Sequence, residues 1–269
     1  NGISESRLQP GVATGTPVPD VTSIPSATAI PSLATVVVPF STPVATRILP
    51  EQPLQRRADE PVLAAPQVVG PKTFSVGNMT YGYAGGGLWF FGELRNDGPS
   101  ARESVSVQIT LFDETGREQV SNTGSVQIRY LNPGEIAPFT VLFGSDRQPD
   151  VPPERYSIEV RSREADFQLN YTVRNISVGD EVAELRSFGS IILSGKVHND
   201  NAEPVKFVRV QAVFYDVSDN VVGVSDVYVE PLAAGDTLVP DAEGRFELRG
   251  TILTTIPASY RIFAFASRK

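Results

Sequence analysis

The chain has no cysteine and only one histidine, one methionine and one tryptophan among its 269 residues. Without cysteine there is no disulfide framework, no thiolate metal site and no cysteine nucleophile. The single histidine, His198, excludes most histidine-based catalysis and the common zinc sites. These absences predict a protein that has no catalytic residue, cofactor or metal, and that is not an enzyme.

Lysine is scarce as well, with 4 lysines among the 23 basic residues, and the formal net charge is −8. An acidic chain is disfavoured as a partner of nucleic acid or of anionic lipid. No run approaches the roughly 18 apolar residues that would suggest a membrane span. The sequence begins at Asn1 and not at Met. We expect a targeting or anchoring segment to have been removed or to lie outside the sequence, and an arbitrary boundary is the alternative.

Proline is concentrated at the N-terminus, where residues 1–66 hold 11 of the 22 prolines, with Thr, Ser, Ala and Val between them. Frequent proline prevents helix and interrupts a sheet ladder, so residues 1–72 are predicted to be an extended arm or linker. Residues 34–40 could add as an edge strand to a partner's sheet, and a mildly apolar linker patch is the alternative. The residues that contact the partner would be Val36, Val37, Val38 and Phe40.

After the arm, one pattern occurs twice with an offset of 103 residues. Residues 92–97 (GELRND) return as 195–200 (GKVHND), and residues 107–113 (VQITLFD) return as 210–216 (VQAVFYD). Later landmarks follow with a slight drift: 131–134 (LNPG) corresponds to 232–235 (LAAG), and Tyr156 to Tyr260. A repeat of about 100 residues has the size of one β-sandwich. We therefore predict two domains, 73–164 and 165–269.

Both repeats alternate apolar and polar residues, and turn signals recur between the alternating segments. Strands are expected at 74–81, 87–95, 104–113, 118–130, 136–143 and 155–163, then at 167–178, 185–198, 205–216, 220–230, 244–251 and 258–267. No segment has a helical period of useful length. The predicted fold class is all-β, with two tandem immunoglobulin-like antiparallel β-sandwiches behind a long extended N-terminal arm. Because little linker separates the repeats, we expect them to sit at a fixed angle.

The succession GELRND, then VQITLFD with a glycine turn, then Leu131-Asn132-Pro133-Gly134-Glu135 before Phe139, resembles the FxLYD-type family of bacterial envelope domains. The second repeat fits this pattern at 195–200, 210–216 and 232–236. It departs from it by an insertion at 239–244 and by Asp219-Asn220, which replace the turn glycine. The resemblance implies an exported, often lipid-anchored protein that is seldom an enzyme. The Thr/Pro-rich leader is similar in style to lipoprotein stalks, although a mature lipoprotein begins with a lipidated Cys.

The candidate sites for chemistry are weak. His198 lies at a strand end where the first repeat has Arg95, which indicates an exposed residue and not a ligand. Acidic residues gather in expected loops: Asp113, Glu114, Asp180, Glu181, Glu184, Asp216, Asp219, Asp236, Asp241 and Glu243. None has the spacing of a calcium loop, and 216–220, which comes nearest, is most simply a turn. The glycines at 85–87 precede a strand, which favours a hairpin loop over a phosphate cradle.

Three consecutive aromatic residues are the best surface candidates in the repeats. Trp89, Phe90 and Phe91 point to alternate faces of the sheet, so one face is core. On the other face, Trp89 and Phe91 either form a partner-binding surface or are covered by the neighbouring domain or the arm.

The function expected from these features is a non-enzymatic, extracytoplasmic structural or accessory subunit. It would dock on a larger, membrane-associated assembly of protein subunits through its arm and its sandwich surfaces, and a membrane electron-transfer complex is one candidate host. Its membrane association would be indirect or through an anchor outside the sequence. The alternative is a stalked cell-surface binding or adhesion module that recognises polysaccharide or protein. A hydrolase that uses loop carboxylates is the third and weakest hypothesis, because no pair of acids is selected.

Overall fold

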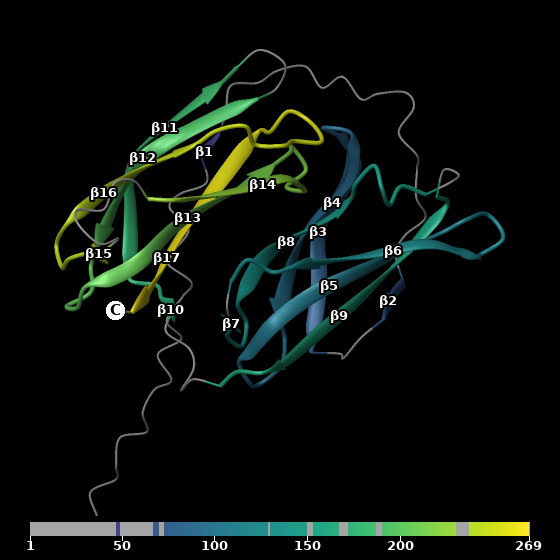
Figure 1. Ribbon diagram of the computed structural model, residues 1–269, viewed down its shortest axis with the longest axis horizontal. Coiled ribbons are helices and arrows are strands. Elements are labelled where there is room, and N and C mark those ends of the chain that lie inside the picture. Colours follow the sequence, from purple (N-terminus) through teal and green to yellow (C-terminus); the bar gives the residue numbers. More distant parts are fainter. Residues whose placement is uncertain are drawn as a thin grey trace, which may run out of the picture. The chain divides into compact units, whose positions relative to one another are not determined.

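A computed structural model describes residues 47–48, 67–69, 73–128, 130–149, 153–166, 172–186, 190–229 and 237–268. All of them belong to one unit, Val38–Lys269. Every regular element in these ranges is a β-strand, and the pairings are antiparallel apart from the parallel pair β2 and β9 (Figure 1). The all-β prediction and the two antiparallel sandwiches are thereby confirmed.

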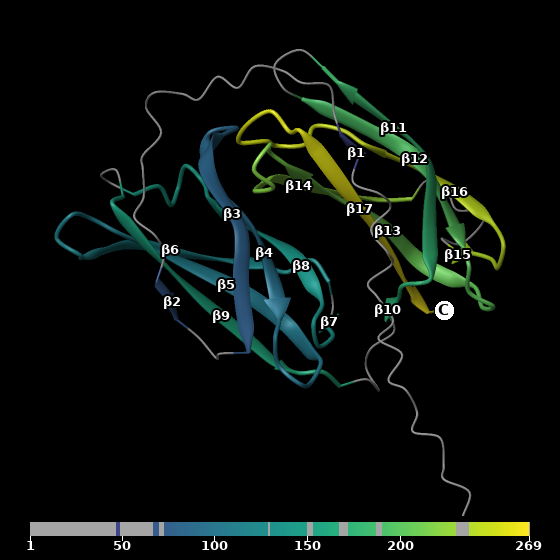
Figure 2. The ribbon, with the colours of Figure 1, turned by 180° about the vertical axis from the view of Figure 1, so that it is seen from behind.

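The first repeat is built from two sheets. One sheet has the order β2 (Gln67–Val69), β9 (Arg155–Glu164), β5 (Arg102–Phe112) and β6 (Glu118–Ser125), and β7 (Tyr130–Leu131) also pairs with β5. The other has the order β3 (Phe74–Ala84), β4 (Gly87–Asn96) and β8 (Ile136–Phe143). Figure 2 shows β3 lying in front of β5 and β9, as in two layers of a sandwich. Their facing sides enclose a core that includes Phe90, Ile109, Phe139 and Ile158.

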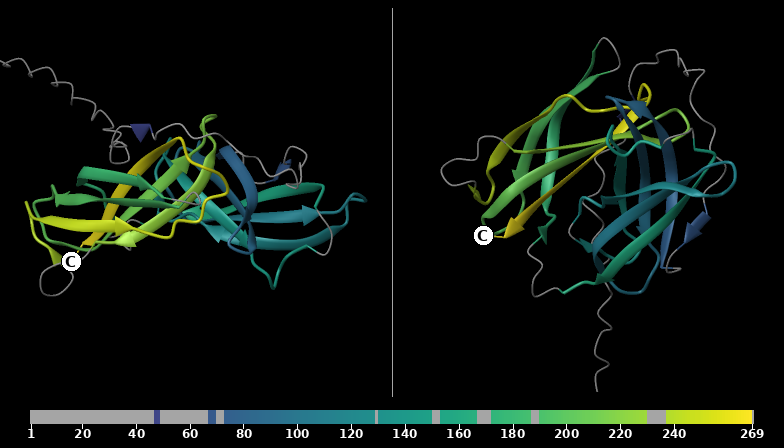
Figure 3. Two further views of the ribbon diagram at one scale, coloured as in Figure 1. Left: turned by 90° about the horizontal axis from the view of Figure 1, so that it is seen from above. Right: turned by 45° about the vertical axis from the view of Figure 1, so that its right-hand side comes forward.

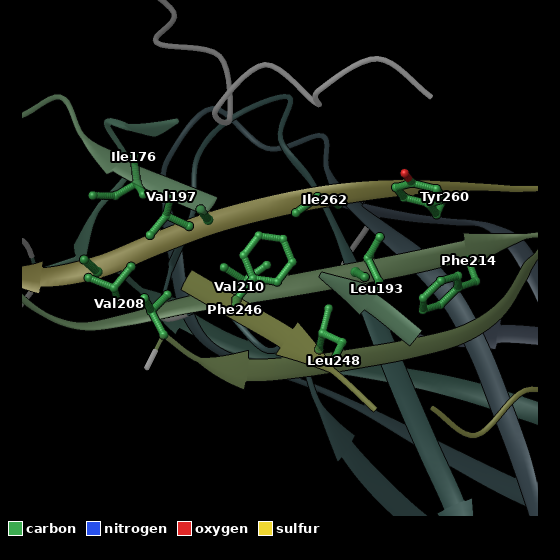
Figure 4. Close-up of a cluster of buried hydrophobic side chains, with 14 of the residues drawn as sticks. Ile176, Leu193, Val197, Val208, Val210, Phe214, Phe246, Leu248, Tyr260 and Ile262 are labelled. Atoms are coloured by element: carbon green, nitrogen blue, oxygen red, sulfur yellow. The ribbon is translucent and has the colours of Figure 1, made fainter. Parts of the chain in front are cut away.

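The second repeat has the same plan. One sheet has the order β1 (Arg47–Ile48), β17 (Ser259–Arg268), β13 (Val205–Tyr215) and β14 (Val221–Tyr228), with β10 (Thr172–Val173) on β17 and β15 (Thr237–Leu238) on β13. The other has the order β11 (Ile176–Leu185), β12 (Ile191–Asn199) and β16 (Glu243–Leu248) (Figure 3). Figure 4 shows side chains of both sheets, among them Leu193, Val210, Phe246 and Ile262, pointing into the space between the layers.

The repeated glycine is explained by a close approach of an aromatic ring. A Cβ atom on Gly92 would lie 2.7 Å from Cζ of Phe139, and one on Gly195 would lie 2.8 Å from Cζ of Phe246. Each glycine pairs in register with the residue that bears the ring. The ring therefore lies over the bare backbone of its neighbour strand, which is a recognised use of glycine inside a strand.

The repeated asparagine is explained by the hydrogen bonds that its buried side chain forms with loop backbone. Asn96 is 0% exposed, and its Nδ2 donates to the carbonyl oxygens of Ser100 and Leu131 while its Oδ1 accepts from the N–H of Gly98. Asn199, also 0% exposed, repeats the arrangement with Glu203 and Leu238 as acceptors and Asn201 as donor. The side chain thus satisfies loop backbone groups that would otherwise be buried without partners.

One expected correspondence between the repeats is wrong. The carbonyl that accepts from Asn96 belongs to Leu131, and the one that accepts from Asn199 belongs to Leu238, so Leu238 is the counterpart of Leu131. In the same way Gly134 N–H donates to the Asn96 carbonyl and Asp241 N–H to the Asn199 carbonyl. The sequence LNPGE therefore corresponds to LVPDA at 238–242, and the extra residues precede β15. Residues 232–235 lie outside the described residues.

The acidic segment around residue 180 was also placed wrongly, since it was expected in a loop between strands at 167–178 and 185–198. Asp180, Glu181 and Glu184 lie on β11, whose register with β12 shifts between Gly179 and Val182. Asp180 has a φ of 54°, and Asn78 in the first repeat has a φ of 50° at the matching shift between Gly77 and Thr80. A β-bulge thus interrupts the alternation in both repeats.

Candidate functional site

The outward face of the β17-β13-β14 sheet contributes side chains both to a buried cluster between the repeats and to a cavity. On β13, Val208, Val210, Ala212 and Phe214 point into the core of the second repeat. Because neighbouring side chains on a strand alternate, Arg209, Gln211, Val213 and Tyr215 share the opposite face. One part of this face packs against the first repeat, and another part lines a cavity.

The covered part is an apolar cluster that joins the two repeats, which we call the junction. Its buried members are Phe91, Val213, Tyr215, Val221 and Phe263, and Trp89 and Val224 pack against them. Phe91 is 1% exposed and its ring stacks on that of Trp89, with the centroids 5.6 Å apart. Of the two interpretations of these aromatics, cover by the neighbouring domain is the one that the structure shows for Phe91.

A buried polar centre lies beside this cluster. The hydroxyl of Tyr215 donates a hydrogen bond of 2.7 Å to Oε1 of Glu93, and Nδ2 of Asn78 donates one of 2.6 Å to Oε2. The guanidinium of Arg261 lies 4.9 Å from the centre of the Tyr215 ring, and its Nη1 is 3.8 Å from Oε1 of Glu93. Burial, and then the charge of Glu93, raises the pKa of Tyr215, so its hydroxyl is a permanent donor at neutral pH.

Further hydrogen bonds and an ion pair connect the two repeats. Thr80 Oγ1 donates to the carbonyl of Val221. Arg174 donates to the carbonyl of Tyr130, lies 4.4 Å from the centre of that ring, and forms an ion pair with Glu135. Burial lowers the pKa of Arg174, which nevertheless stays protonated at neutral pH because guanidinium is so basic.

The open part of the face lines a cavity of about 450 Å³, and both repeats contribute to its wall. The second repeat supplies aromatic rings: Phe207 and Tyr228 are each 57% exposed, and the half-buried Phe265 lines the cavity with them. Arg209 is held among these rings, because its Nε donates to Asp226 at 2.7 Å and its Nη2 donates to Gln127 at 2.9 Å. The volume is within the range of small-molecule and cofactor sites.

The first repeat supplies small hydroxyl side chains to the same cavity, and they occupy matching positions. Ser106 pairs with Ser125 in β5 and β6, as Arg209 pairs with Tyr228 in β13 and β14. Ser104 and Phe207 lie in equivalent bulges, and both have a φ of 51°. The fold therefore accepts serine at the three positions where the second repeat has Phe207, Arg209 and Tyr228. Sequence reasoning missed these residues, although the offset of 103 would have aligned them with the serines.

The structure places the predicted surface residues as follows. Val36, Val37, Val38 and Phe40 lie outside the described residues. Trp89 is half-buried, and its Nε1 donates a hydrogen bond of 3.0 Å to the carbonyl of Ala84. It lies at the edge of the junction and not among the residues that line the cavity.

His198 and Asp216 form hydrogen bonds with neighbouring groups of the chain. Nδ1 of His198 lies 2.6 Å from Oδ1 of Asp200, and this hydrogen bond is the main reason that the pKa of His198 is raised. Asp216 Oδ1 accepts from the N–H groups of Ser218 and Asn220, so the segment nearest to a calcium loop is a capped turn. Within the described ranges, no group of three or more His, Asp or Glu residues is arranged to hold a metal ion, and no helix is long and apolar enough to cross a membrane.

No family model and no curated protein matches the chain. Solved structures with some similarity include red sea bream transglutaminase (8% identity, TM-score 0.21) and a β-glucuronidase of glycoside hydrolase family 2 (13% identity, TM-score 0.20). The alignments cover 73% and 64% of this chain but 29% and 20% of those proteins. Procruciferin, an 11S globulin of Brassica napus, has 10% identity and a TM-score of 0.14, with 68% and 76% of the two chains covered. Similarities at these TM-scores carry no argument about function.

Proposed function

We propose that the chain is a non-enzymatic, extracytoplasmic binding module that presents the cavity beside the junction to a partner in the cell envelope. The observation that supports it best is the pair Phe207 and Tyr228, two large rings that are each 57% exposed at positions where the first repeat has serine. Exposed aromatics grouped around an arginine are typical of recognition sites. The extracytoplasmic location rests on the resemblance to FxLYD-type envelope domains.

The junction supports this function because it fixes the cavity walls to each other. A ligand that contacts both repeats is bound more tightly when the two walls need no ordering on binding. Buried contacts of Phe91, Val213 and Phe263, together with the Tyr215–Glu93 hydrogen bond, supply that restraint. The module would thus act as one preorganised unit behind its proline-rich arm.

The test is sedimentation of the purified full chain with isolated cell envelopes of the source organism. The wild type should co-sediment, and the double variant Phe207→Ser/Tyr228→Ser should remain in the supernatant. Tyr83→Ser is the matched control, since Tyr83 is an exposed aromatic of the first repeat that does not line the cavity. Equal sedimentation of the wild type and the double variant would refute the proposal.

A second candidate is an accessory subunit of a larger membrane-associated assembly, in which the arm region helps to hold the protein in place. It is supported by the resemblance to FxLYD-type envelope domains, and the arm would act through residues other than β1 and β2, which pair with the chain's own strands β17 and β9. A membrane electron-transfer complex remains a candidate host. Gentle solubilisation of native membranes, followed by isolation of the tagged chain, should then yield a stoichiometric set of subunits, whereas recovery of the chain alone would exclude this function.

A further inference from the structure

We infer that the cavity beside the junction binds an uncharged oligosaccharide, an inference that rests on the binding function proposed above. A sugar ring has an apolar C–H face and a rim of hydroxyl groups. It therefore needs a flat apolar surface on one side and groups that both donate and accept hydrogen bonds around it. The aromatic surface comes from the second repeat, and hydroxyl groups come from both repeats, three of them from the first.

The wall from the second repeat provides the flat apolar surface. Phe207, Tyr228 and Phe265 present three rings, and the guanidinium of Arg209 lies 5.7 Å and 6.0 Å from the centres of the last two. Aromatic faces contribute a large apolar contact area at little cost in side-chain freedom. The conformation of Phe207 also favours a role beyond the fold. Its φ of 51° is strained for a bulky residue, and more than half of its surface remains in water.

The wall from the first repeat provides the hydrogen-bonding groups. Ser104, Ser106 and Ser125 line the cavity, and Thr172 and Ser267 add hydroxyls at its second-repeat side. A hydroxyl is one donor and two acceptors, and it can rotate to suit its partner, which is the complement of a sugar hydroxyl. Gln127 adds a planar carboxamide that is already oriented by Arg209. The serine and threonine side chains are short, so they lose little freedom when a ligand orders them.

The charge of the cavity favours a neutral ligand over an anionic one. Arg209 is the one charged residue among the described residues that line it, and its guanidinium forms an ion pair with Asp226. An anion would have to compete with that carboxylate in a chain whose net charge is −8. Acidic glycans, phosphates and nucleic acids are therefore disfavoured. An uncharged sugar neither competes with the Asp226 carboxylate nor is repelled by the net charge.

The binding test uses isothermal titration of the full chain with uncharged hexasaccharides, namely β-1,4-linked glucose, β-1,3-linked glucose, β-1,4-linked N-acetylglucosamine and α-1,6-linked mannose. At least one should bind. Phe207→Ser and Tyr228→Ser should each weaken that binding about tenfold or more, whereas Tyr83→Ser should leave it unchanged. Circular dichroism should show that the serine variants are folded, as the serines at the equivalent positions of the first repeat lead us to expect. If no hexasaccharide binds, or if the serine variants bind as the wild type does, the inference fails.

The envelope assay separates this inference from the proposed function. An excess of the hexasaccharide that binds in the titration should abolish co-sedimentation with the envelopes, and pretreatment of the envelopes with protease should not. The opposite result, together with loss of binding by Phe207→Ser/Tyr228→Ser, would mean that the cavity binds a protein: the binding function would stand and the sugar inference would fall. Sedimentation that neither treatment nor variant changes would overturn both.

Discussion

Replacement of Tyr215 by phenylalanine should destabilise the protein by removing one hydroxyl from the buried polar centre. Tyr215 is 1% exposed and donates at 2.7 Å to Glu93, which is itself 6% exposed. The variant keeps the ring, and with it the stacking of Arg261 at 4.9 Å. The carboxylate of Glu93 retains Asn78 as a donor but loses its hydroxyl partner in a site that excludes water.

The expected loss of unfolding free energy is about 2 kcal/mol, because a hydrogen bond to a charged group contributes about 1.5–3 kcal/mol. For a folded part of roughly 200 residues this corresponds to a melting temperature lower by about 4–8 °C. Urea unfolding followed by tryptophan fluorescence measures it, since the one tryptophan, Trp89, packs against the junction. A single cooperative transition in the wild type is the condition for that free energy to be defined.

Tyr156→Phe is the matched control for this prediction. Tyr156 is 8% exposed, and its hydroxyl lies 3.9 Å from the sulfur of Met79, a weak acceptor. Burial raises the pKa of Tyr156 to about 12, so this tyrosine is also protonated at neutral pH. Its replacement should cost less than about 0.5 kcal/mol. Equal losses in the two variants would refute the assignment of a specific role to the Tyr215–Glu93 bond.

Three further results are expected in the second repeat. Asn199→Ala should cost about 3 kcal/mol by circular dichroism in urea, because three hydrogen bonds between this buried side chain and backbone groups are lost at about 1 kcal/mol each. Gly195→Ala should cost about 1–3 kcal/mol in the same assay, since its Cβ would lie 2.8 Å from the buried ring of Phe246. In an NMR titration, the pKa of His198 should exceed 6.5 and should fall in Asp200→Asn. The raised pKa means that its small stabilising effect is present at acidic pH and is lost as the pH rises through that value.

The repeat and the alternation made most of the fold predictable. Strands expected at 74–81, 87–95, 205–216 and 258–267 appear as β3, β4, β13 and β17, because outside the bulges of β3 and β13 every second side chain points into a core. Tyr156 and Tyr260 are counterparts as predicted, since they pair with Leu111 and Phe214 at the same offset.

The errors arose where the local pattern is ambiguous. At 179–184 a bulge shifts the alternation, and three acidic side chains give the segment the composition of a loop. The signal that was missed is the sequence ISVGD at 176–180, which repeats FSVGN at 74–78. At 232–235 a Leu and a Gly at the expected spacing concealed the true counterpart, whose signal was Pro240 matching Pro133.

The junction and the cavity could not be predicted from the sequence, because they depend on which outer sheet face meets which. Alternation shows that Val213 and Tyr215 point away from their own core, but it does not identify Phe91 as their neighbour. The same holds for Ser106 and Arg209, which are 103 residues apart and line one cavity.

Phe207 should lower the stability of the protein through its backbone conformation. A residue other than glycine at a φ of 51° is strained by about 1 kcal/mol or more, and glycine removes that strain while it adds roughly 0.5–1 kcal/mol of unfolded-state freedom. Phe207→Gly should therefore leave the stability unchanged or raise it by up to about 1 kcal/mol in urea unfolding, and Ser104→Gly, with the same φ, should do likewise. Phe207→Gly should also weaken envelope binding, because it removes one of the two exposed rings of the cavity. If instead Phe207→Gly destabilised the protein by 2 kcal/mol or more while Ser104→Gly did not, the ring would be part of the packing, and its exposure would no longer argue for a ligand.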